Sequence, residues 1–519
     1  MKTRTSHIRS FLLSLCLALL FSTSLFCNRS NPQGFQPWMV SGTDLPVEEQ
    51  ALITRTPFQP GAKAAAQPTP VTQVSIPTPD DPHPMRQLRS EAEQYTVKGG
   101  DTLGQIARRF QVSLNVIIEA NDLQNPNLLS VGQGLWIPAP DPQNRGPSAK
   151  VIPDSELVYG PLSANFDIKG FINSQKGYLS GFSEEVDDRT LSGAQIVQRI
   201  ALEYSVNPRL LLAVLEYRSG WVTQRDPDPA SLDFPIVQAE AWRKGLYLQL
   251  AWAANNLNRG YYLWKAGAGD VWILADGMVI PISPVINAGT AGVQYFFSLL
   301  YGHEDWLTAV LETGLSQTYR NFFGNPFNMA VEPLIPPGLT QPTMQLPFEP
   351  GKQWAFTGGP HGGWADGSAW AAIDFAPPGD ALGCVRSDEW VVAVADGPIL
   401  RADNGAVIQD LDGDGLEQTG WVVLYMHVES RERVQAGDTV KAGERIGHPS
   451  CEGGVSTGTH LHLARRYNGE WIAADGDLPF VLDGWVSRGT GVEYDGFLDR
   501  DGQTVEAWEG YFPENSIGR

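Results

Sequence analysis

The stretch STGTHLHLARRYNGEW, residues 456–471, is the part of this sequence that decides the nature of the C-terminal domain. The protein has only 8 histidines, yet His460 and His462 lie two residues apart here, in a run with strand character. On a β-strand, side chains at positions i and i+2 point to the same face. Two imidazoles on one face are either a surface coincidence or part of a metal site.

Short runs that precede this stretch, such as EWVVAVADGPIL and GWVVLYMHV, alternate apolar and polar residues between glycine-rich turns. This periodicity predicts β-strands, and no long helix is expected in this part of the chain. We therefore expect an all-β domain with an antiparallel sheet over residues 352–519.

Two further residues of this domain can complete a metal site, and a third can assist beside it. Asp374 lies at the end of a short apolar strand in AAIDFAPPGD, and His361 lies thirteen residues earlier in a Gly-rich loop that can fold back onto that strand. A catalytic zinc usually has three protein ligands and keeps a position for water. With one histidine of the pair, these residues make a His/Asp/His set. His427, at the end of WVVLYMH, and the other histidine of the pair can then transfer protons beside the metal.

The motifs TGTHLHLARR, LYMHV and IDFAPPGD…VVAVADG resemble those of the lysostaphin/LytM-type zinc endopeptidases of bacterial cell walls. Most members of that family have the first histidine four residues before the aspartate, where this chain has Trp370. The run HGGWADGSAWAAID is similar instead to the beta-lytic branch, which has a longer insertion. The resemblance implies one zinc ion per chain, with these ligands: His361, Asp374 and His462. It implies His427 and His460 as the catalytic pair.

Residues 94–139 have the pattern of a separate small domain. A strand at Tyr95–Val97 precedes a helix capped by Asp101 or Thr102, and Ser113 starts a second helix before a closing strand. The motifs GDTL, ANDL and NPN in this βααβ order closely resemble the LysM module, which binds glycans that contain N-acetylglucosamine. The resemblance implies that these residues contact glycan: Gly100, Asp101, Thr102, Leu103, Asn125, Pro126 and Leu128.

Residues 155–335 have broad apolar faces at helical spacing, and Ser192 with Gln195 predicts a capping box. The segment VNPRLLLAVLEYRSGW is similar to the helix that carries the catalytic glutamate in lysozyme-like lytic transglycosylases. The corresponding position here is Arg218, and Glu216 lies on a different face of the helix. Because glycosidic cleavage needs a carboxylic acid, we expect a mainly α, degenerate lysozyme-like domain that can still bind glycan. Unrelated helical packing is the alternative.

The N-terminus has the features of an export signal. Three basic residues precede the apolar run from Phe11 to Phe26, which is short for a membrane-spanning helix. We expect a signal peptide over residues 1–27, with Cys27 as a candidate for lipidation, followed by a Pro-rich linker over residues 28–93. Because exported proteins favour disulfides, Cys384 and Cys451 are a candidate pair, which leaves Cys27 unpaired in the mature chain.

An acidic cluster, DLDGDGLEQ, places Asp410, Asp412 and Asp414 at alternating positions before Gly415. This resembles the start of a calcium loop, but the twelfth position, where an EF-hand has glutamate, is Trp421. Calcium binding is one interpretation of the cluster. A hairpin turn rich in Asp and Gly is the other.

The formal net charge of −21 argues against a nucleic-acid partner, which would require a basic surface. The favoured hypothesis is an extracytoplasmic zinc endopeptidase, secreted or anchored at the cell envelope, that hydrolyses peptide bonds of peptidoglycan. The LysM module would hold it on the glycan. Two alternatives remain from the sequence: a non-enzymatic wall-binding adaptor with an inert peptidase-like domain, and a glycan-cleaving enzyme that uses Glu216 of the middle domain.

Overall fold

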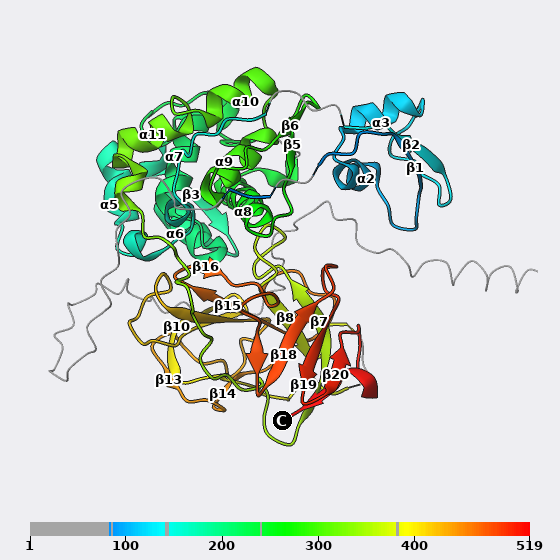
Figure 1. Ribbon diagram of the computed structural model, residues 1–519. Helices are drawn as coiled ribbons and strands as arrows, with labels where there is room; N and C mark the ends of the chain where they lie inside the picture. The colour runs from blue at the N-terminus through cyan, green and yellow to red at the C-terminus, as the bar shows by residue number, and fades with distance from the viewer. Residues whose placement is uncertain (1–81, 85–86, 141–144, 239–240, 380–382) are drawn as a thin grey trace, which may run out of the picture.

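The computed structural model describes residues 82–84, 87–140, 145–238, 241–379 and 383–519 of the chain. The predicted signal segment with Cys27 and most of the Pro-rich linker lie outside these residues. The described chain forms an N-terminal βααβ domain, a helical domain and a C-terminal β domain (Figure 1). None of the helices in these ranges has the length and apolarity required for a membrane span.

The N-terminal domain has the predicted order of elements: β1 (Glu93–Thr96), α2 (Leu103–Phe110), α3 (Leu114–Ala120) and β2 (Gly134–Ile137). Both helices begin at hydroxyl caps, since Gln105 N donates to Thr102 Oγ1 at 3.2 Å and Val116 N donates to Ser113 Oγ at 3.2 Å. Asp101, the other predicted cap, instead accepts hydrogen bonds from Tyr95 Oη and Lys98 N, both at 2.7 Å. Its carboxylate therefore closes the turn after β1.

The helical domain is built around α8, whose 20 residues are mostly buried. Ser192 and Gln195 form the predicted capping box at the start of α6. The helices and strands of the helical domain are α4 (Asp154–Leu157), α5 (Ile168–Gln175), β3 (Ser183–Val186), β4 (Arg189–Ser192), α6 (Gly193–Tyr204), α7 (Pro208–Ser219), α8 (Leu246–Lys265), β5 (Val271–Ile273), β6 (Val279–Pro281), α9 (Ala288–Ser298), α10 (His303–Val310) and α11 (Leu315–Phe323). Short 3-10 turns are η1 (Pro161–Ser163), η2 (Tyr178–Gly181), η3 (Pro229–Ser231), η4 (Ala241–Arg243) and η5 (Pro326–Met329).

The β domain contains a nine-stranded sheet in the order β13-β10-β11-β12-β15-β8-β7-β21, with β16 paired to β15. Its pairings are antiparallel, as the sequence predicts. The strands of this sheet are β7 (Gln353–His361), β8 (Ala372–Ala376), β10 (Gly397–Asp403), β11 (Ala406–Asp410), β12 (Trp421–Met426), β13 (Thr439–Val440), β15 (Leu461–Tyr467), β16 (Glu470–Trp471) and β21 (Ser516–Gly518). Smaller sheets contain β9 (Val391–Val392), β14 (Arg445–Gly447), β17 (Val481–Leu482), β18 (Trp485–Gly489), β19 (Gly496–Arg500) and β20 (Gln503–Glu506), and η6 (Pro513–Asn515) precedes β21.

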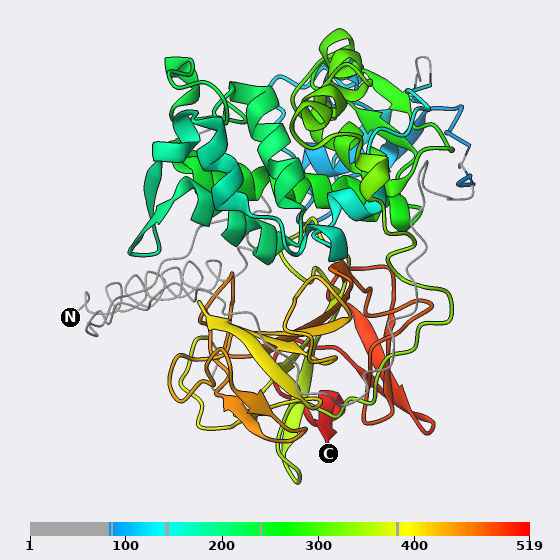
Figure 2. The ribbon, with the colours of Figure 1, turned by 90° about the vertical axis from the view of Figure 1, so that its left-hand side faces the viewer.

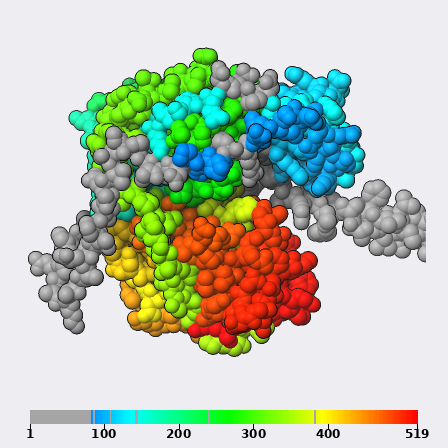
Figure 3. Space-filling model, in the orientation of Figure 1, coloured from blue at the N-terminus to red at the C-terminus, as the bar shows by residue number. Residues whose placement is uncertain are grey.

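The helical domain lies next to the β domain (Figures 2 and 3). It covers one face of this sheet, and the two domains share a hydrophobic core. Leu424, Ala464 and Trp471 of the β domain belong to the same buried cluster as Tyr204 of α6. The opposite face packs on the β domain's own core. All six residues of β12 are consequently buried. The predicted alternation of buried and solvent-facing residues is therefore wrong for this strand, because the helical domain takes the place of solvent.

The N-terminal domain and the segment that precedes it both contact the helical domain. Gln111 Nε2 donates to Asp270 Oδ2 at 3.2 Å. In the segment that leads into the domain, the His83 ring stacks on Trp264 with centroids 4.2 Å apart, and His83 N donates to Pro284 O at 2.9 Å. These contacts attach the N-terminal domain to the side of the helical domain (Figure 1).

Candidate metal centre

Four neighbouring strands of the sheet, in the order β12-β15-β8-β7, bring the predicted metal-site residues together. The register of the sheet places His462 of β15 opposite Asp374 of β8, and Met426, the last residue of β12, opposite His462. His427 therefore follows β12 at the same level as the other residues. His361 is the last residue of β7, not part of the Gly-rich loop as the sequence suggested. Two register shifts in β7 carry it past Asp374.

The three proposed ligands converge on one point. His361 Nε2 lies 2.9 Å from His462 Nδ1 and 3.2 Å from Asp374 Oδ1, and His462 Nδ1 lies 3.3 Å from the same oxygen. Tetrahedral zinc with bonds of 2.0–2.1 Å has ligand–ligand edges of about 3.3 Å. Asp374 Oδ1 is buried and has no hydrogen-bond partner among the described residues. A cation held by these three atoms would satisfy it, so the donor set fits a single zinc ion.

Backbone carbonyls determine which nitrogen each ligand histidine presents. His361 Nδ1 donates to Gly359 O at 2.8 Å, and His462 Nε2 donates to Gly363 O at 3.1 Å. A carbonyl oxygen can only accept, so each ring carries its proton on the nitrogen that faces the carbonyl. The opposite nitrogens, His361 Nε2 and His462 Nδ1, are left with lone pairs directed to the common point.

The electrostatics of the site favour a positive charge beside Asp374. Burial opposes ionisation of this carboxyl, but the neighbouring His361 and His460 hold its pKa well below the usual range. Burial also disfavours a charged His361, yet the carboxylate of Asp374 outweighs it and raises the pKa of His361. The pKa of His462 is lowered, mainly by burial. An ionised carboxylate with largely buried imidazoles is the chemistry that a divalent metal ion requires.

The two other imidazoles, His427 and His460, lie beside the ligands. Their ring centroids are 4.4 Å apart, and His460 Nε2 lies 3.8 Å from Asp374 Oδ2. His427 has a φ of +66° and donates from Nδ1 to Glu452 O at 3.0 Å, while His460 Nδ1 donates to Gly458 O at 2.7 Å. Burial, reinforced by the neighbouring imidazoles, holds the pKa of His427 well below its usual value. Both rings therefore keep Nε2 for other partners.

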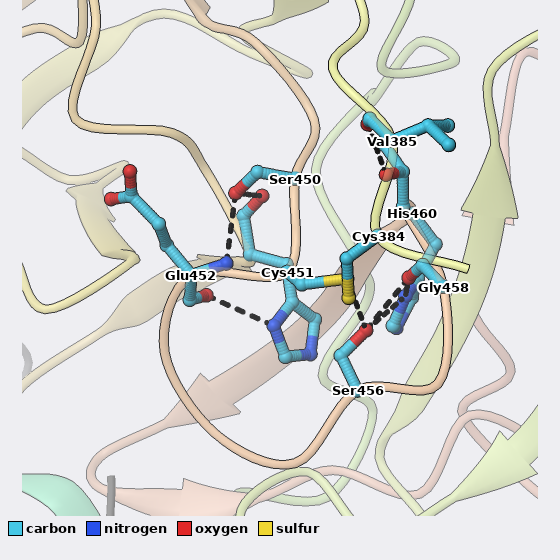
Figure 4. The surroundings of a disulfide bond; sticks show 10 residues. Cys384, Val385, Ser450, Cys451, Glu452, Ser456, Gly458 and His460 are labelled. Carbon is cyan, nitrogen blue, oxygen red and sulfur yellow. Dashed lines mark hydrogen bonds between the residues drawn. A yellow bond between two sulfur atoms is a disulfide. The ribbon is translucent and has the colours of Figure 1, made fainter. Parts of the chain in front are cut away.

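A disulfide between Cys384 and Cys451 holds the loop that orients these two rings (Figure 4). Glu452, whose carbonyl accepts from His427, directly follows Cys451. Ser456 Oγ lies 3.3 Å from Cys451 Sγ and donates to Gly458 O at 2.7 Å. The pair predicted from cysteine arithmetic thus connects to both histidines.

Sequence reasoning missed Tyr494, which stacks on the proposed ligand His361 with ring centroids 4.2 Å apart. Tyr494 has a backbone φ of +68° and lies in the turn that leads to β19. Gly359 N donates to Tyr494 O at 2.8 Å, which ties this turn to the end of β7. A single tyrosine in a Gly-rich turn gives no sequence signal for such a contact. Trp370, where most family members have the first ligand, instead accepts a backbone hydrogen bond from Ala474.

The predicted glycan-contacting residues occupy two loops of the N-terminal domain. Gly100, Thr102, Asn125 and Leu128 are exposed, Leu128 with 72% of its surface. Leu103 is a correction to the sequence expectation, since only 3% of it is exposed. It is the first residue of α2, and its side chain packs in the core of the domain. Only its backbone is therefore left for a surface ligand.

In the helical domain, Glu216 caps the loop that follows its own helix. Its Oε2 accepts from Val222 N and Thr223 N, both at 3.1 Å, and its Oε1 accepts from Thr223 Oγ1 at 2.5 Å. Glu216 and Arg218 line a cavity of about 410 Å³. Because both carboxylate oxygens already hold the loop, Glu216 is poorly placed to donate a proton to a sugar oxygen.

The acidic cluster forms the turn between β11 and β12. Asp410 Oδ1 accepts from Asp412 N and Gly413 N, both at 3.0 Å, as in an Asx turn. The carboxylates of Asp410, Asp412 and Asp414 lie within reach of one ion. Burial, together with the two neighbouring carboxylates, raises the pKa of Asp412 to about 7. The hairpin interpretation is confirmed, and calcium binding stays a prediction.

A His/Asp/His donor set with two accessory imidazoles on an antiparallel sheet defines a mononuclear metallohydrolase centre. Residues 373–474 match the model of Peptidase family M23, residues 95–138 match the LysM domain, and residues 150–336 match the N-terminal domain of LasA. The chain is accordingly a metallopeptidase of the lysostaphin/LytM type in family M23, with a LysM domain before the peptidase domain.

Two curated relatives illustrate the likeness. Protease LasA of Pseudomonas aeruginosa is 25% identical over 353 residues, which cover 62% of this chain and 75% of LasA. A beta-lytic metalloendopeptidase of Achromobacter lyticus is 28% identical over 193 residues, which cover 35% of this chain and 46% of that protein. Among solved structures, the M23 metalloprotease pseudoalterin is 25% identical with a TM-score of 0.28, over 33% of this chain and 99% of that chain.

Proposed function

We propose that this protein is an extracytoplasmic zinc endopeptidase that hydrolyses peptide bonds of peptidoglycan. The observation that carries the proposal is the convergence of three donor atoms, from His361, Asp374 and His462, at separations of 2.9–3.3 Å. The similarity to LasA and to a beta-lytic metalloendopeptidase supports peptide-bond hydrolysis. The LysM domain supports peptidoglycan as the substrate.

A zinc ion held by this donor set supplies a Lewis acid that polarises a peptide carbonyl and makes water a better nucleophile. The chain's own contribution is the placement of His427 and His460. Each has its Nδ1 committed to a backbone carbonyl, so each can use Nε2 at the scissile bond. One imidazole can accept the proton of the attacking water and return it to the leaving amine. The other can donate a hydrogen bond to the developing oxyanion when its Nε2 also carries a proton, that is, as an imidazolium.

The LysM domain would hold the enzyme on its substrate. The exposed loops that contain Thr102 and Asn125–Leu128 are the proposed glycan contacts, and the −21 net charge makes binding by simple basic attraction a poor alternative. Binding there raises the effective concentration of the peptidase at the wall without a change at the metal centre. The predicted signal segment supports export, either as a freely secreted chain or with Cys27 as a candidate for lipid attachment.

The test uses the purified mature chain and insoluble peptidoglycan. We expect about one zinc per chain by elemental analysis, and new amino termini in the soluble fraction, with fragments assigned by mass spectrometry. New reducing ends without new amino termini would refute the proposal in favour of the glycan-cleaving alternative at Glu216. Neither product from a zinc-loaded chain would refute peptidase activity and favour a wall-binding adaptor.

A separate binding test addresses the LysM loops. Asn125→Ala and Leu128→Ala should reduce sedimentation of the chain with peptidoglycan. Leu114→Ala is the matched control, because Leu114 is also an exposed apolar residue of this domain but lies at the start of α3. Equal sedimentation of all three variants would refute glycan binding by these loops.

A further inference from the structure

The loop between β7 and β8, residues 362–371, connects the metal centre to the helical domain. Within it, Gly363 N donates to Ala369 O at 3.0 Å and Trp364 N donates to Ser368 Oγ at 2.9 Å. These bonds close the segment into a compact turn with Asp366 at its tip. At its base, the Gly363 carbonyl accepts from His462 Nε2 at 3.1 Å. The tip and the ligand histidine therefore belong to one small hydrogen-bonded unit.

Side chains of helix α8 in the helical domain form hydrogen bonds with the tip of this turn. Asn255 Nδ2 donates to Asp366 Oδ1 at 2.6 Å, and Arg259 Nη1 donates to Asp366 Oδ2 at 2.6 Å. Asn255 also accepts at its Oδ1 from Gly367 N at 2.9 Å. Asn255 and Arg259 are four residues apart, so both lie on the same face of α8. The Asp366 carboxylate is thus shared between two donors that lie more than 100 residues away in the sequence.

The fit between the turn and α8 is close. A Cβ atom on Gly367 would lie 2.0 Å from Asn255 O, so only glycine allows this approach. Burial raises the pKa of Asp366, but Arg259 and Asn255 outweigh it and keep the pKa below its usual value. An isolated, half-exposed ion pair would contribute little to stability. Here the pair is one of three hydrogen bonds at a close contact, and the neighbouring Trp364 packs edge-on to Tyr204 of α6.

We propose that Asn255 and Arg259 of the helical domain are positioning residues for the metal centre: through Asp366 they hold the Gly363 carbonyl against His462. The inference rests on the zinc site of the proposed function and goes beyond it, because it makes the helical domain part of what determines metal affinity. If the carbonyl moves away, Nε2 of His462 loses its acceptor. The ring can then rotate or place its proton on Nδ1, the nitrogen that the metal needs.

The test compares Asp366→Ala with Asp233→Ala in the full chain. Asp233 forms a similar half-exposed ion pair, with Lys244 at 3.0 Å, in the same helical domain. Competition with a chromophoric chelator gives the zinc affinity of each variant. We expect Asp366→Ala to bind zinc about tenfold more weakly than wild type, because partners of ligand histidines typically contribute 10–100-fold. Asp233→Ala should remain within about twofold of wild type, as expected for an isolated surface pair.

Two further measurements separate positioning from general destabilisation. Arg259→Ala should also weaken zinc binding. The double variant, Arg259→Ala with Asp366→Ala, should bind zinc no more weakly than the single variant with the lower affinity, because both changes break the same contact. In the metal-free chain, nitrogen NMR of His462 should show proton density moving from Nε2 to Nδ1 in Asp366→Ala. A variant that is only less stable would change neither the zinc affinity relative to wild type nor the His462 tautomer, as long as it is measured below its unfolding temperature.

The inference is overturned if Asp366→Ala and Arg259→Ala bind zinc as tightly as Asp233→Ala, whatever their activity. A wild-type chain that binds zinc but cleaves no peptide bond would instead refute the proposed activity. In that case the affinity comparison would still support the positioning role, so the two failures are distinguishable.

Discussion

Replacement of Trp471 by alanine tests whether the helical and β domains are one cooperative unit. Trp471 is 3% exposed and lies in the core that both domains share. Its backbone N donates to Tyr262 Oη at 2.9 Å and its indole Nε1 donates to Tyr204 O at 3.4 Å, so it faces α8 and the end of α6. Its ring also leaves no room for a side chain at Gly363, where a Cβ would lie 2.7 Å from Trp471 Cε3.

The expected loss of unfolding free energy follows from the area that the Trp471 side chain buries. A tryptophan side chain buries 150–250 Å², which at about 25 cal/mol per Å² corresponds to roughly 4–6 kcal/mol as an upper bound. Measured substitutions of buried Trp or Phe by Ala lose about 3–5 kcal/mol. The long indole hydrogen bond adds less than about 1 kcal/mol. We therefore expect Trp471→Ala to lower the free energy of unfolding by about 4 kcal/mol.

The assay is urea denaturation of the full chain, followed in parallel by far-UV circular dichroism and tryptophan fluorescence. Wild type should show one coincident transition for the helical and β domains, and Trp471→Ala should shift it to lower urea. Trp508→Ala is the control, because Trp508 lies in the same domain but is 54% exposed, and its loss should stay within about 0.5 kcal/mol. A loss below 1 kcal/mol for Trp471→Ala, or separate transitions in wild type, would refute the shared core.

Asp374→Ala should reduce bound zinc from about one per chain to near zero, whereas His427→Ala should keep the zinc and lose at least about a hundredfold in peptide cleavage; equal zinc contents with equal activities would contradict the assignment. Replacing both Cys384 and Cys451 by serine should lower the unfolding free energy in urea by about 4 kcal/mol on the chain-entropy model, given the separation of 67 residues, and an unchanged midpoint would contradict this. Asp412→Asn should stabilise the chain more at pH 8 than at pH 5. Because the pKa of Asp412 in the folded state is raised to about 7, wild-type stability falls as pH rises from the ordinary carboxyl pKa of about 4 to about 7, and it is lowest above that value. Solvent screening at this exposed turn limits the gain to about 1 kcal/mol, and an equal shift of the melting temperature at both pH values would exclude the effect.

Local patterns predicted the N-terminal domain well because its signals lie within a few residues of each other. Ser113 and the apolar positions of α2 specify caps and a core without any distant partner. The pair His460 and His462 was equally local, since strand geometry alone puts both on one face. Asp374 and His427 could be placed because each follows or ends an apolar run.

Features that depend on distant contacts could not be predicted. The two shifts in β7 that bring His361 to the metal centre arise from pairing with β8, and no residue pattern marks them. The complete burial of β12 depends on the helical domain that covers it. The hydrogen bonds of Asn255 and Arg259 with Asp366 join residues more than 100 positions apart. In the sequence, each of these residues looks like an ordinary solvent-exposed polar residue.

The attachment of the LysM domain through Gln111 and His83 has a consequence for how the enzyme would search its substrate. A Pro-rich joint alone would let the domain swing, and the reach of the catalytic site would follow the length of that tether. Because the domain is docked on the helical domain, which shares its core with the peptidase, the spacing from anchor to active site becomes a property of the fold. If the chain binds and cleaves peptidoglycan as proposed, this fixed spacing would bring cross-links at one offset from the anchoring sugar within range, and other cross-links would require release and rebinding.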